Sequence, residues 1–385
     1  MNIGVIGAGQ VGLTFALLCE KSGYTVLVSD KEEDHVNNLN QSICLTNDPL
    51  VQKMLFEVYD FSATTNNLEV IEKSDIIFTF VPTPSNTDGS YDTSPVFEVA
   101  NEFFEAFKLD IPVFNKKFVV CSTTNPGDVE QIQKKLSTFS IQVSYNPVLC
   151  SQPEIIKGYE ESDIVLIGTE YQELSNDLVT IYNKIQTTPV NAHVMSIKAS
   201  EIAYLGLNSF LSYKINFANM MGEILTKSNL SVETDSVLNA IGGDTRVGKK
   251  YLKYGFGFGG PFLPKHNRGL SHYAKELGMS VDILTMNEEF NENHLTFLKE
   301  LYIKQNPDKS NPFVFNFLTY KSNGKSIEES QPFKLCIDLL EEGYYVNVLE
   351  TESISKQLSE LSEQYDNRLK FYKFGTNPEG FKIIL

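Results

Sequence analysis

The chain has 385 residues, 42% of them hydrophobic and 21% charged, which is an ordinary globular composition with enough length for two or three domains. Its formal net charge of −17 argues against a nucleic-acid backbone or an anionic membrane as a partner. The five scattered cysteines form no CxxC pair, no basic leader opens the chain, and no apolar run reaches ~18–20 residues, so we expect a soluble cytoplasmic protein without a metal site or membrane span.

The chain opens with a strand–turn–helix–strand pattern. Residues 1–6 are rich in strand formers, a helical pattern runs to about residue 22, and residues 24–29 form a second candidate strand. Further strand candidates are residues 75–81, 118–122, 141–145 and 163–167, with helical stretches between most of them. This alternation predicts a mainly parallel sheet that is covered by helices on both faces.

The turn after the first candidate strand reads GAGQVG. In this context Gly7 permits a tight turn, Gly9 lets the backbone approach a pyrophosphate, and Gly12 allows close packing of helix on strand. Asp30, at the end of the second strand, is placed to accept hydrogen bonds from ribose hydroxyls, which favours NAD over NADP. The alternative is a glycine turn without a ligand.

Three polar loops follow later candidate strands. They read VPTP at residues 81–84, STTNPG at residues 122–127 and YNPVLCSQ at residues 145–152. In open α/β sheets, ligands lie beyond the carboxyl ends of the strands. The loops therefore form a cofactor crevice or are plain connections, and their residues leave both possibilities open.

From about residue 196 to 226 the apolar residues recur at helical spacing without a proline. This predicts one long helix that acts as a spine or a dimerisation element, although two packed core helices would give the same pattern. Tyr204 and Asn208 lie one turn apart and can face the same pocket. A packing or capping role is the alternative for these polar side chains.

The next informative segments are DTR at residues 244–246 and GFGFGGPFLPKHNRGL at residues 255–270. Arg246 could bind a phosphate or ribose, or could form a surface salt bridge. Residues 312–318, 331–342 and 345–349 then repeat a strand–helix–strand order. This predicts a second, smaller doubly wound domain.

Taken in order, these motifs resemble the UDP-glucose/GDP-mannose dehydrogenase (nucleotide-sugar dehydrogenase) family over essentially the whole chain. A dehydrogenase of the 6-phosphogluconate type would share the first motif and the long helix but should lack GFGGP and the second Rossmann-like domain. The resemblance implies an α/β fold with a Rossmann NAD-binding domain at residues 1–195. It further implies a central long-helix dimerisation domain at residues 196–300 and a smaller Rossmann-like nucleotide-sugar domain at residues 301–385. The implied partners are NAD, a UDP- or GDP-sugar and a second copy of the chain.

The resemblance also implies roles for individual residues. Those at the family's cofactor positions are Gly7, Gly9, Gly12, Asp30, Val81, Thr83 and Thr123. Those at or beside its substrate positions are Leu149, Gln152, Asn208, Arg246, Gly257, Gly259, Lys265 and Lys321. The candidates for catalysis are Tyr204, Asn208, Thr123 and His266, and no metal is implied.

Four positions depart from the family pattern. Phe262 replaces the nucleophilic cysteine, Tyr204 the lysine, His266 the aspartate and Val148 the glutamate. Family members oxidise the sugar C6 alcohol to a carboxylate with two NAD, and the thiol holds the aldehyde between the two steps. A phenyl ring cannot do this. Tyr204 could donate to an alkoxide, or act as a base if a cation such as Lys265 or His266 lowered its pKa. Cys150 is a weak candidate for a substitute nucleophile.

Three functions remain open from the sequence. The first is an NAD-dependent oxidoreductase that acts on a nucleotide sugar and stops after one hydride or returns it. The second is a catalytically inactive homologue that binds nucleotide sugar or NAD and has a regulatory or structural role. The third is a full four-electron dehydrogenase with unconventional residues.

Overall fold

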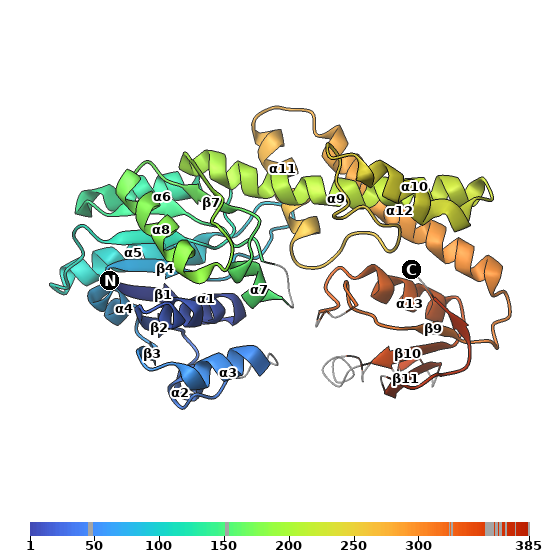
Figure 1. The fold of residues 1–385 in the computed structure, drawn as a ribbon, viewed down its shortest axis with the longest axis horizontal. Coiled ribbons are helices and arrows are strands. Elements are labelled where there is room, and N and C mark those ends of the chain that lie inside the picture. Colours follow the sequence, from blue (N-terminus) through green and yellow to red (C-terminus); the bar gives the residue numbers. More distant parts are fainter. Residues whose placement is uncertain are drawn as a thin grey trace. The chain divides into compact units, whose positions relative to one another are not determined.

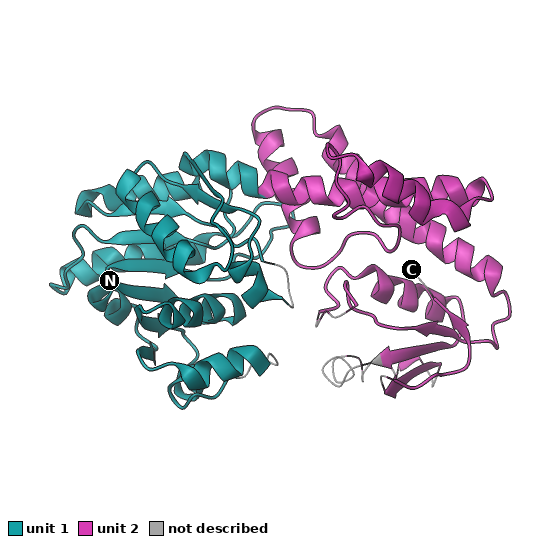
Figure 2. Ribbon diagram, viewed as in Figure 1, with its two compact units in different colours: residues 1–204 teal, residues 205–385 magenta. Residues whose placement is uncertain are grey.

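The computed structural model describes residues 1–44, 49–150, 154–322, 324, 326–350, 358, 361, 364–365, 368–373 and 375–383. The chain forms two compact units, residues 1–204 and residues 205–385 (Figure 1 and Figure 2). The division into three domains at residues 195 and 300 remains a prediction.

The first unit is built on an eight-stranded sheet with the order β3-β2-β1-β4-β5-β6-β7-β8. All neighbouring strands pair in parallel except β6 and β7, which pair antiparallel through Tyr145 and Gly168. This order, with a crossover between β1 and β4, is that of a doubly wound Rossmann sheet, as expected. The strands are β1 (Asn2–Ile6), β2 (Thr25–Ser29), β3 (Phe61–Thr64), β4 (Ile76–Thr79), β5 (Lys117–Val120), β6 (Gln142–Tyr145), β7 (Val165–Gly168) and β8 (Ala192–Met195).

Helices cover both faces of this sheet. One core cluster joins the sheet to α1, α3, α7 and α8, and a second joins it to α4, α5 and α6. Strand residues alternate between them: Ile76 and Phe78 belong to the first cluster, and Ile77 to the second. The helices are α1 (Gln10–Lys21), α2 (Glu33–Asn40), α3 (Pro49–Glu57), α4 (Asn67–Lys73), α5 (Ser94–Lys108), α6 (Asp128–Leu136), α7 (Ile155–Glu160) and α8 (Gln172–Ile185), with a 3-10 turn η1 (Ser137–Phe139).

The predicted long helix is confirmed as the single helix α9 (Ile197–Lys227), which has 31 residues. The alternative of two packed helices is therefore wrong. Its continuity follows from a run without proline and from the helical spacing of its apolar residues. The two compact units meet within its sequence, after Tyr204.

The second unit combines helices with a small parallel sheet of order β11-β10-β9-β12. Its core lies between this sheet, α13 and the later part of α12. The predicted strand–helix–strand order is confirmed: β9 is shorter than the expected residues 312–318, and β10 lies one residue later than the expected residues 345–349. After α9 come η2 (Ser231–Glu233), α10 (Thr234–Gly243), α11 (Leu263–Glu276), α12 (Asp282–Gln305), β9 (Phe313–Phe315), α13 (Gln331–Glu341), β10 (Val346–Glu350), β11 (Leu369–Lys373) and β12 (Phe381–Lys382).

Candidate functional site

The glycine turn after β1 has no room for a side chain at two of its three glycines. Gly7 has a φ of 96°, and a Cβ on it would lie 2.9 Å from the carbonyl carbon of Phe80. A Cβ on Gly12 would lie 2.1 Å from the Gly7 oxygen. A Cβ on Gly9 would meet no protein atom within 4 Å. The tight turn thus leaves open space beside Gly9, where a backbone can approach a pyrophosphate.

Helix α1 begins at this turn without a side-chain cap. Gly9, its N-cap residue, has no side chain that could cap the helix, and among the described residues no side chain is seen to accept a hydrogen bond from the first amides. These N–H groups carry the partial positive charge of the helix terminus and suit an anion. Together with the space beside Gly9, they fit the diphosphate of a dinucleotide.

Asp30 follows β2 and holds the glycine turn in place. Its Oδ2 accepts a hydrogen bond from the Ala8 amide at 3.0 Å, and its Oδ1 accepts one from the Glu32 amide at 3.1 Å. On α2, His35 Nε2 lies 2.9 Å from the Ala8 oxygen. Both polar groups of Ala8 are therefore bound from the β2–α2 side. The ribose contact of Asp30 remains a prediction.

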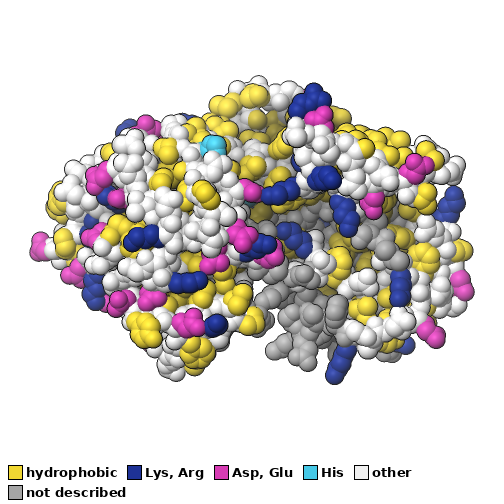
Figure 3. All heavy atoms as spheres, viewed as in Figure 1, with side chains coloured by type: hydrophobic (Ala, Val, Ile, Leu, Met, Phe, Trp, Pro, Cys, Tyr) yellow, Lys and Arg dark blue, Asp and Glu magenta, His cyan; other side chains and the backbone are white. Residues whose placement is uncertain are grey.

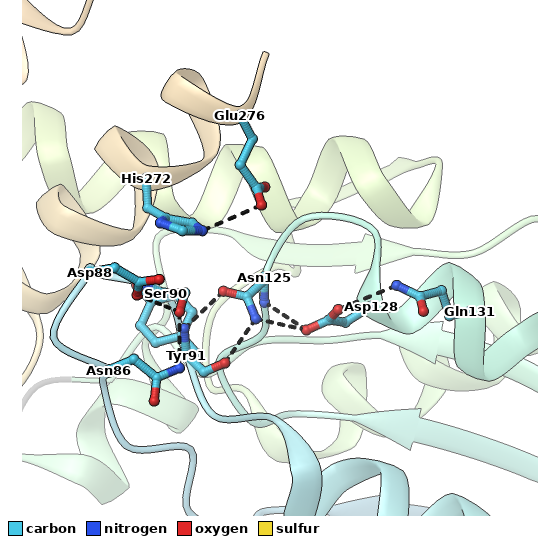
Figure 4. A network of polar contacts seen from close by, with 9 residues as sticks. All are labelled: Asn86, Asp88, Ser90, Tyr91, Asn125, Asp128, Gln131, His272 and Glu276. Carbon is cyan, nitrogen blue, oxygen red and sulfur yellow. Dashed lines mark hydrogen bonds and ion pairs between the residues drawn. The ribbon is translucent and has the colours of Figure 1, made fainter. Parts of the chain in front are cut away.

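The polar loops after β4 and β5 are joined to each other (Figure 4). Asn125 Nδ2 donates to the Tyr91 oxygen and to Asp128 Oδ2, both at 2.9 Å, and Asn125 Oδ1 accepts from the Tyr91 amide at 2.9 Å. Ser122 Oγ donates to the Val81 oxygen at 2.7 Å. The two loops that the sequence singled out separately therefore form one continuous rim at the carboxyl ends of the strands. Their predicted cofactor contacts are not tested by this geometry.

Tyr204 is a buried residue that connects the loop after β5 with the loop after β6. Its hydroxyl donates to the Val148 oxygen at 3.1 Å and forms a hydrogen bond with the Thr123 side chain. Burial raises the pKa of Tyr204 well above its usual value, and the Thr123 hydrogen bond offsets only part of this rise. The condition under which Tyr204 could act as a base, a lowered pKa, is therefore not met.

Cys150 shows the features of an inert thiol. Burial raises its pKa to about 12, so the thiolate is scarce at neutral pH. Its sulfur lies 2.8 Å from the position that a Cβ on Gly158 would take, which places it against α7. We therefore do not assign a nucleophilic role to Cys150.

In the second unit, side-chain amides bind the backbone of the glycine run. The Gly255 amide donates to Asn219 Oδ1 at 3.0 Å, and the Gly257 amide donates to Gln331 Oε1 at 2.6 Å. Asn291 both accepts from the Phe258 amide and donates to its oxygen, each at 2.9 Å. Helices α9, α12 and α13 thus hold this loop in one conformation.

This packing gives a structural reason for the glycines. A Cβ on Gly257 would lie 2.1 Å from Asn291 Oδ1, and one on Gly259 would lie 2.4 Å from the Glu329 oxygen. Gly260 has a φ of 81° and its amide donates to the Glu328 oxygen at 3.0 Å. The loop conformation requires these glycines, while the substrate contacts of Gly257 and Gly259 remain predictions.

Phe262, for which the resemblance implies the family's cysteine position, is the N-cap residue of α11. Its ring centroid lies 5.9 Å from that of His266. His266 is fully buried, and burial together with the charge of Lys265 lowers its pKa to about 3, so its ring is neutral near pH 7. Burial also lowers the pKa of Lys265 to about 8. A phenyl ring and a neutral imidazole therefore lie near each other at the start of α11.

The structure places the other predicted substrate residues as follows. Arg246 forms a bidentate surface ion pair with Asp244, at 3.0 Å and 2.7 Å, and its side chain is 88% exposed. Lys321 Nζ lies 5.7 Å from the Tyr320 ring centroid. Asn208 is half-buried on α9, and Leu149 packs against the second core cluster of the first unit. Gln152 lies outside the described residues.

Several residues that contact or support the glycine turn after β1 or the glycine run of residues 255–260 were not predicted from the sequence. They are His35, Asn291, Gln331, and the buried pair His294 and Glu223. Each bonds to a segment far away in the chain, for example Asn291 to Phe258 and Gln331 to Gly257, which are 33 and 74 residues apart. Local patterns contain no signal for such partners.

In the described part of the chain, no group of three or more His, Cys, Asp or Glu side chains could hold a metal ion. Within the same residues, no helix is long and apolar enough to cross a membrane.

Two family models match the chain. The model described as "UDP-glucose/GDP-mannose dehydrogenase family, NAD binding domain" matches residues 1–186. The model of the central domain of the same family matches residues 198–293. Together they cover most of the first unit and residues 205–293 of the second.

Curated relatives match over most of their length. The chain is 26% identical over 362 residues to the putative UDP-glucose 6-dehydrogenase YtcA of Bacillus subtilis (strain 168), covering 92% of this chain and 82% of that protein. It is 24% identical over 392 residues to the UDP-glucose 6-dehydrogenase of Rickettsia bellii (strain RML369-C), covering 96% and 85%. A solved UDP-glucose dehydrogenase from Pyrobaculum islandicum superposes with a TM-score of 0.84 at 23% identity, covering 97% of this chain and 86% of that one. At this level of identity, the similarity to the solved structure shows a shared fold.

Proposed function

The chain belongs to the UDP-glucose/GDP-mannose dehydrogenase family, and from this premise we propose that it is an NAD-dependent oxidoreductase acting on a nucleotide sugar. In this proposal it transfers one hydride from the sugar to NAD and does not complete the four-electron oxidation. Members of the family are NAD-dependent nucleotide-sugar dehydrogenases, and NAD is the cofactor. One contrast supports the proposal. The glycine turn has the tight conformation and the open space beside Gly9 that suit a dinucleotide, while the resemblance puts Phe262 at the position of the thiol that would hold the intermediate aldehyde.

The residues that would hold NAD are those of the turn and the joined loops. The open space beside Gly9 and the uncapped amides of α1 suit the diphosphate. Asp30 suits a ribose hydroxyl, and Val81, Thr83 and Thr123 border the same rim. When bound, NAD supplies the hydride acceptor. The protein's own task is then to remove the hydroxyl proton while the alcohol carbon loses its hydride and becomes a carbonyl.

Lys265 is the side chain that we propose as the base. Burial lowers its pKa to about 8, so a substantial fraction is neutral at slightly alkaline pH. Tyr204 does not meet this condition, because burial raises its pKa. His266 is neutral but fully buried, with a pKa of about 3, and is a poor acceptor for a hydroxyl proton. Asn208, Arg246, Gly257, Gly259 and Lys321 are proposed to bind the nucleotide sugar.

Mixing the protein with NAD and a panel of UDP- and GDP-sugars is expected to yield one NADH per sugar oxidised, because no thiol at residue 262 can hold an aldehyde for a second transfer. The NADH absorbance at the end point, divided by the sugar consumed, measures this ratio. Lys265→Met should remove the signal without weakening NADH binding. Two NADH per sugar would contradict the proposal and indicate a full dehydrogenase.

A specific observation favours the second function, an inactive homologue that binds nucleotide sugar and NAD. The side chains at the family's reaction positions are apolar or buried: Tyr204 bonds to the Val148 oxygen, and His266 is enclosed beside Phe262. Such a protein would have a regulatory or structural role. Its signature in the same panel is a rise in melting temperature with NADH and one sugar nucleotide but without turnover.

We also propose a homodimer that is built on α9. Phe210, Phe217 and Ile224 are 61%, 40% and 49% exposed and follow each other at intervals of seven residues, so they lie on one side of the helix. Hydrophobic side chains gather over the region of α9 and α10 in Figure 3. An exposed apolar stripe of this length is typical of a helix that packs against another copy.

The double substitution Phe210→Glu with Phe217→Glu is expected to convert the dimer to monomers, because two carboxylates per chain would be buried in an apolar contact. Sedimentation velocity measures the change. Leu109→Glu, at a position that is 63% exposed in the first unit, should leave the assembly intact. A wild-type protein that sediments as a monomer would disprove the dimer.

A further inference from the structure

Glu201 is a fully buried carboxylate that none of the proposed reaction steps uses. It lies in the second turn of α9 and reaches the loop that follows β5. Its Oε1 accepts hydrogen bonds from Thr124 Oγ1 at 2.7 Å and from the Val129 amide at 3.3 Å, and its Oε2 accepts one from the Gly127 amide at 2.6 Å. Two donors from this loop and one from the first turn of α6 thus converge on a single side chain.

These contacts make Glu201 the cap of α6. The N-cap residue of α6 is Gly127, which has no side chain to accept hydrogen bonds and has a φ of 108°. The Asp128 amide donates to the Asn125 oxygen, whereas the Gly127 and Val129 amides donate to Glu201. A carboxylate is the best partner for a helix N-terminus. The N-terminus of α6 is therefore closed by the protein itself, whereas that of α1 is open to an anion.

Tyr204 adds a second attachment one turn further along α9. It bonds to the Thr123 side chain and the Val148 oxygen, as described above. Lys198, one turn before, forms an ion pair with Glu130 of α6 at 2.8 Å. The first turns of α9 are thus joined at successive points to α6, through Lys198, and to the loop of residues 122–127, through Glu201 and Tyr204. Glu201 is the central and most buried of the three.

We propose that Glu201 is a positioning residue for the NAD crevice, which fixes the loop of residues 122–127 and thereby the side chain of Thr123 at the crevice rim. The inference rests on the NAD-binding part of the proposed function and does not depend on turnover. Without the carboxylate, the Gly127 and Val129 amides and the Thr124 hydroxyl lose their common acceptor. The loop that carries Thr123 would then sample other conformations.

The charges around Glu201 give the expected pH dependence. Burial raises its pKa to about 7, and the charge of Asp128 on α6 adds to the rise, while the three hydrogen bonds oppose it. Lys198 and Glu130 form their pair beside the loop, and the Tyr145 hydroxyl is a further titratable group coupled to Glu201. Below pH 7 the protonated carboxyl offers one acceptor fewer to three donors. NADH affinity should therefore fall as the pH falls through about 7.

The test compares NADH dissociation constants by calorimetry at pH 8 and pH 6. Glu201→Ala is expected to weaken NADH binding about tenfold at pH 8, the size of a lost charge-assisted hydrogen bond. Glu201→Gln keeps one acceptor oxygen and should show a smaller loss with a flat pH profile. Leu178→Ala is the matched control, because Leu178 is fully buried on α8 and its truncation lowers stability without touching the loop.

The possible results distinguish the positioning role of Glu201 from the proposed binding of NAD. Weaker NADH binding in both Glu201 variants, with wild-type affinity in Leu178→Ala at a comparable melting temperature, supports the positioning role. Wild-type affinity in the Glu201 variants would overturn this role and leave the proposed function intact. A wild-type protein that does not bind NADH would overturn both. If Glu201→Ala does not fold, Glu201→Gln and its pH profile decide.

Discussion

Gly12→Ala is expected to weaken NADH binding strongly and to lower the stability of the first unit. The added Cβ would lie 2.1 Å from the Gly7 oxygen and 3.1 Å from Phe80 Cβ, so a backbone atom must move. Overpacking of this kind costs typically ~1–3 kcal/mol, and here it falls on the turn that faces the diphosphate. We expect NADH affinity to fall roughly a hundredfold. This loss corresponds to just under ~3 kcal/mol of binding free energy, which is within the range of the strain.

Two other glycine variants serve as controls for the effect of Gly12→Ala on NADH affinity and on stability. Gly9→Ala should weaken NADH binding while the melting temperature stays unchanged, because its Cβ meets no protein atom and only intrudes on the ligand space. Gly243→Ala, at the end of α10, has equally open surroundings and should change neither quantity. Calorimetric titration with NADH and thermal unfolding measure both effects. Wild-type NADH affinity in Gly12→Ala would contradict the assignment of the turn.

The first unit was largely predictable because its signals are local. The glycine turn, Asp30 and the buried strands follow one another closely, and the sheet has the expected parallel order around β1. Two strands were missed, β3 and β8, whose residues are partly or fully exposed. They lie at the two edges of the sheet, and edge strands lack the continuous apolar runs that identify central ones.

The candidate site was predictable only in its outline. The sequence located Tyr204 on a helix but assigned it a possible lowered pKa, whereas burial raises it, and burial depends on tertiary packing that no local pattern encodes. The glycine run was found, but the side chains that hold it were not. Asn291 and Gln331 are ordinary polar residues within helices, and their role arises from contacts with Phe258 and Gly257.

His294 and Glu223 form a hydrogen-bonded pair at the start of the glycine run, with the His294 side chain fully buried and that of Glu223 17% exposed. His294 Nδ1 lies 2.7 Å from Glu223 Oε1, and Nε2 lies 2.8 Å from the Gly255 oxygen. The ring is fully buried and stacks with Phe290 and Phe297, at interplanar angles of 9° and 20°. Because both nitrogens face oxygen acceptors, Nε2–H must donate to Gly255 and a further proton must lie between Nδ1 and the carboxyl group.

Glu223→Ala is therefore expected to lower the free energy of unfolding of the second unit by about 3–5 kcal/mol, because it leaves a buried ring nitrogen without its partner. Urea unfolding measures the loss. The double substitution Glu223→Leu with His294→Leu should cost less than Glu223→Ala, since it removes both polar groups together. Glu276→Ala, in the exposed pair with His272 on α11, is the matched control and should cost less than about 1 kcal/mol.

The same substitution distinguishes an anchor of the glycine loop from a simple core contact. If His294 fixes the start of the loop through the Gly255 oxygen, Glu223→Ala should speed hydrogen exchange at the Gly257 and Phe258 amides more than elsewhere in the unit. A uniform increase would show that the pair stabilises the core without fixing the loop. Faster exchange confined to the loop, together with weaker binding of the sugar nucleotide, would connect this buried pair to the proposed substrate site.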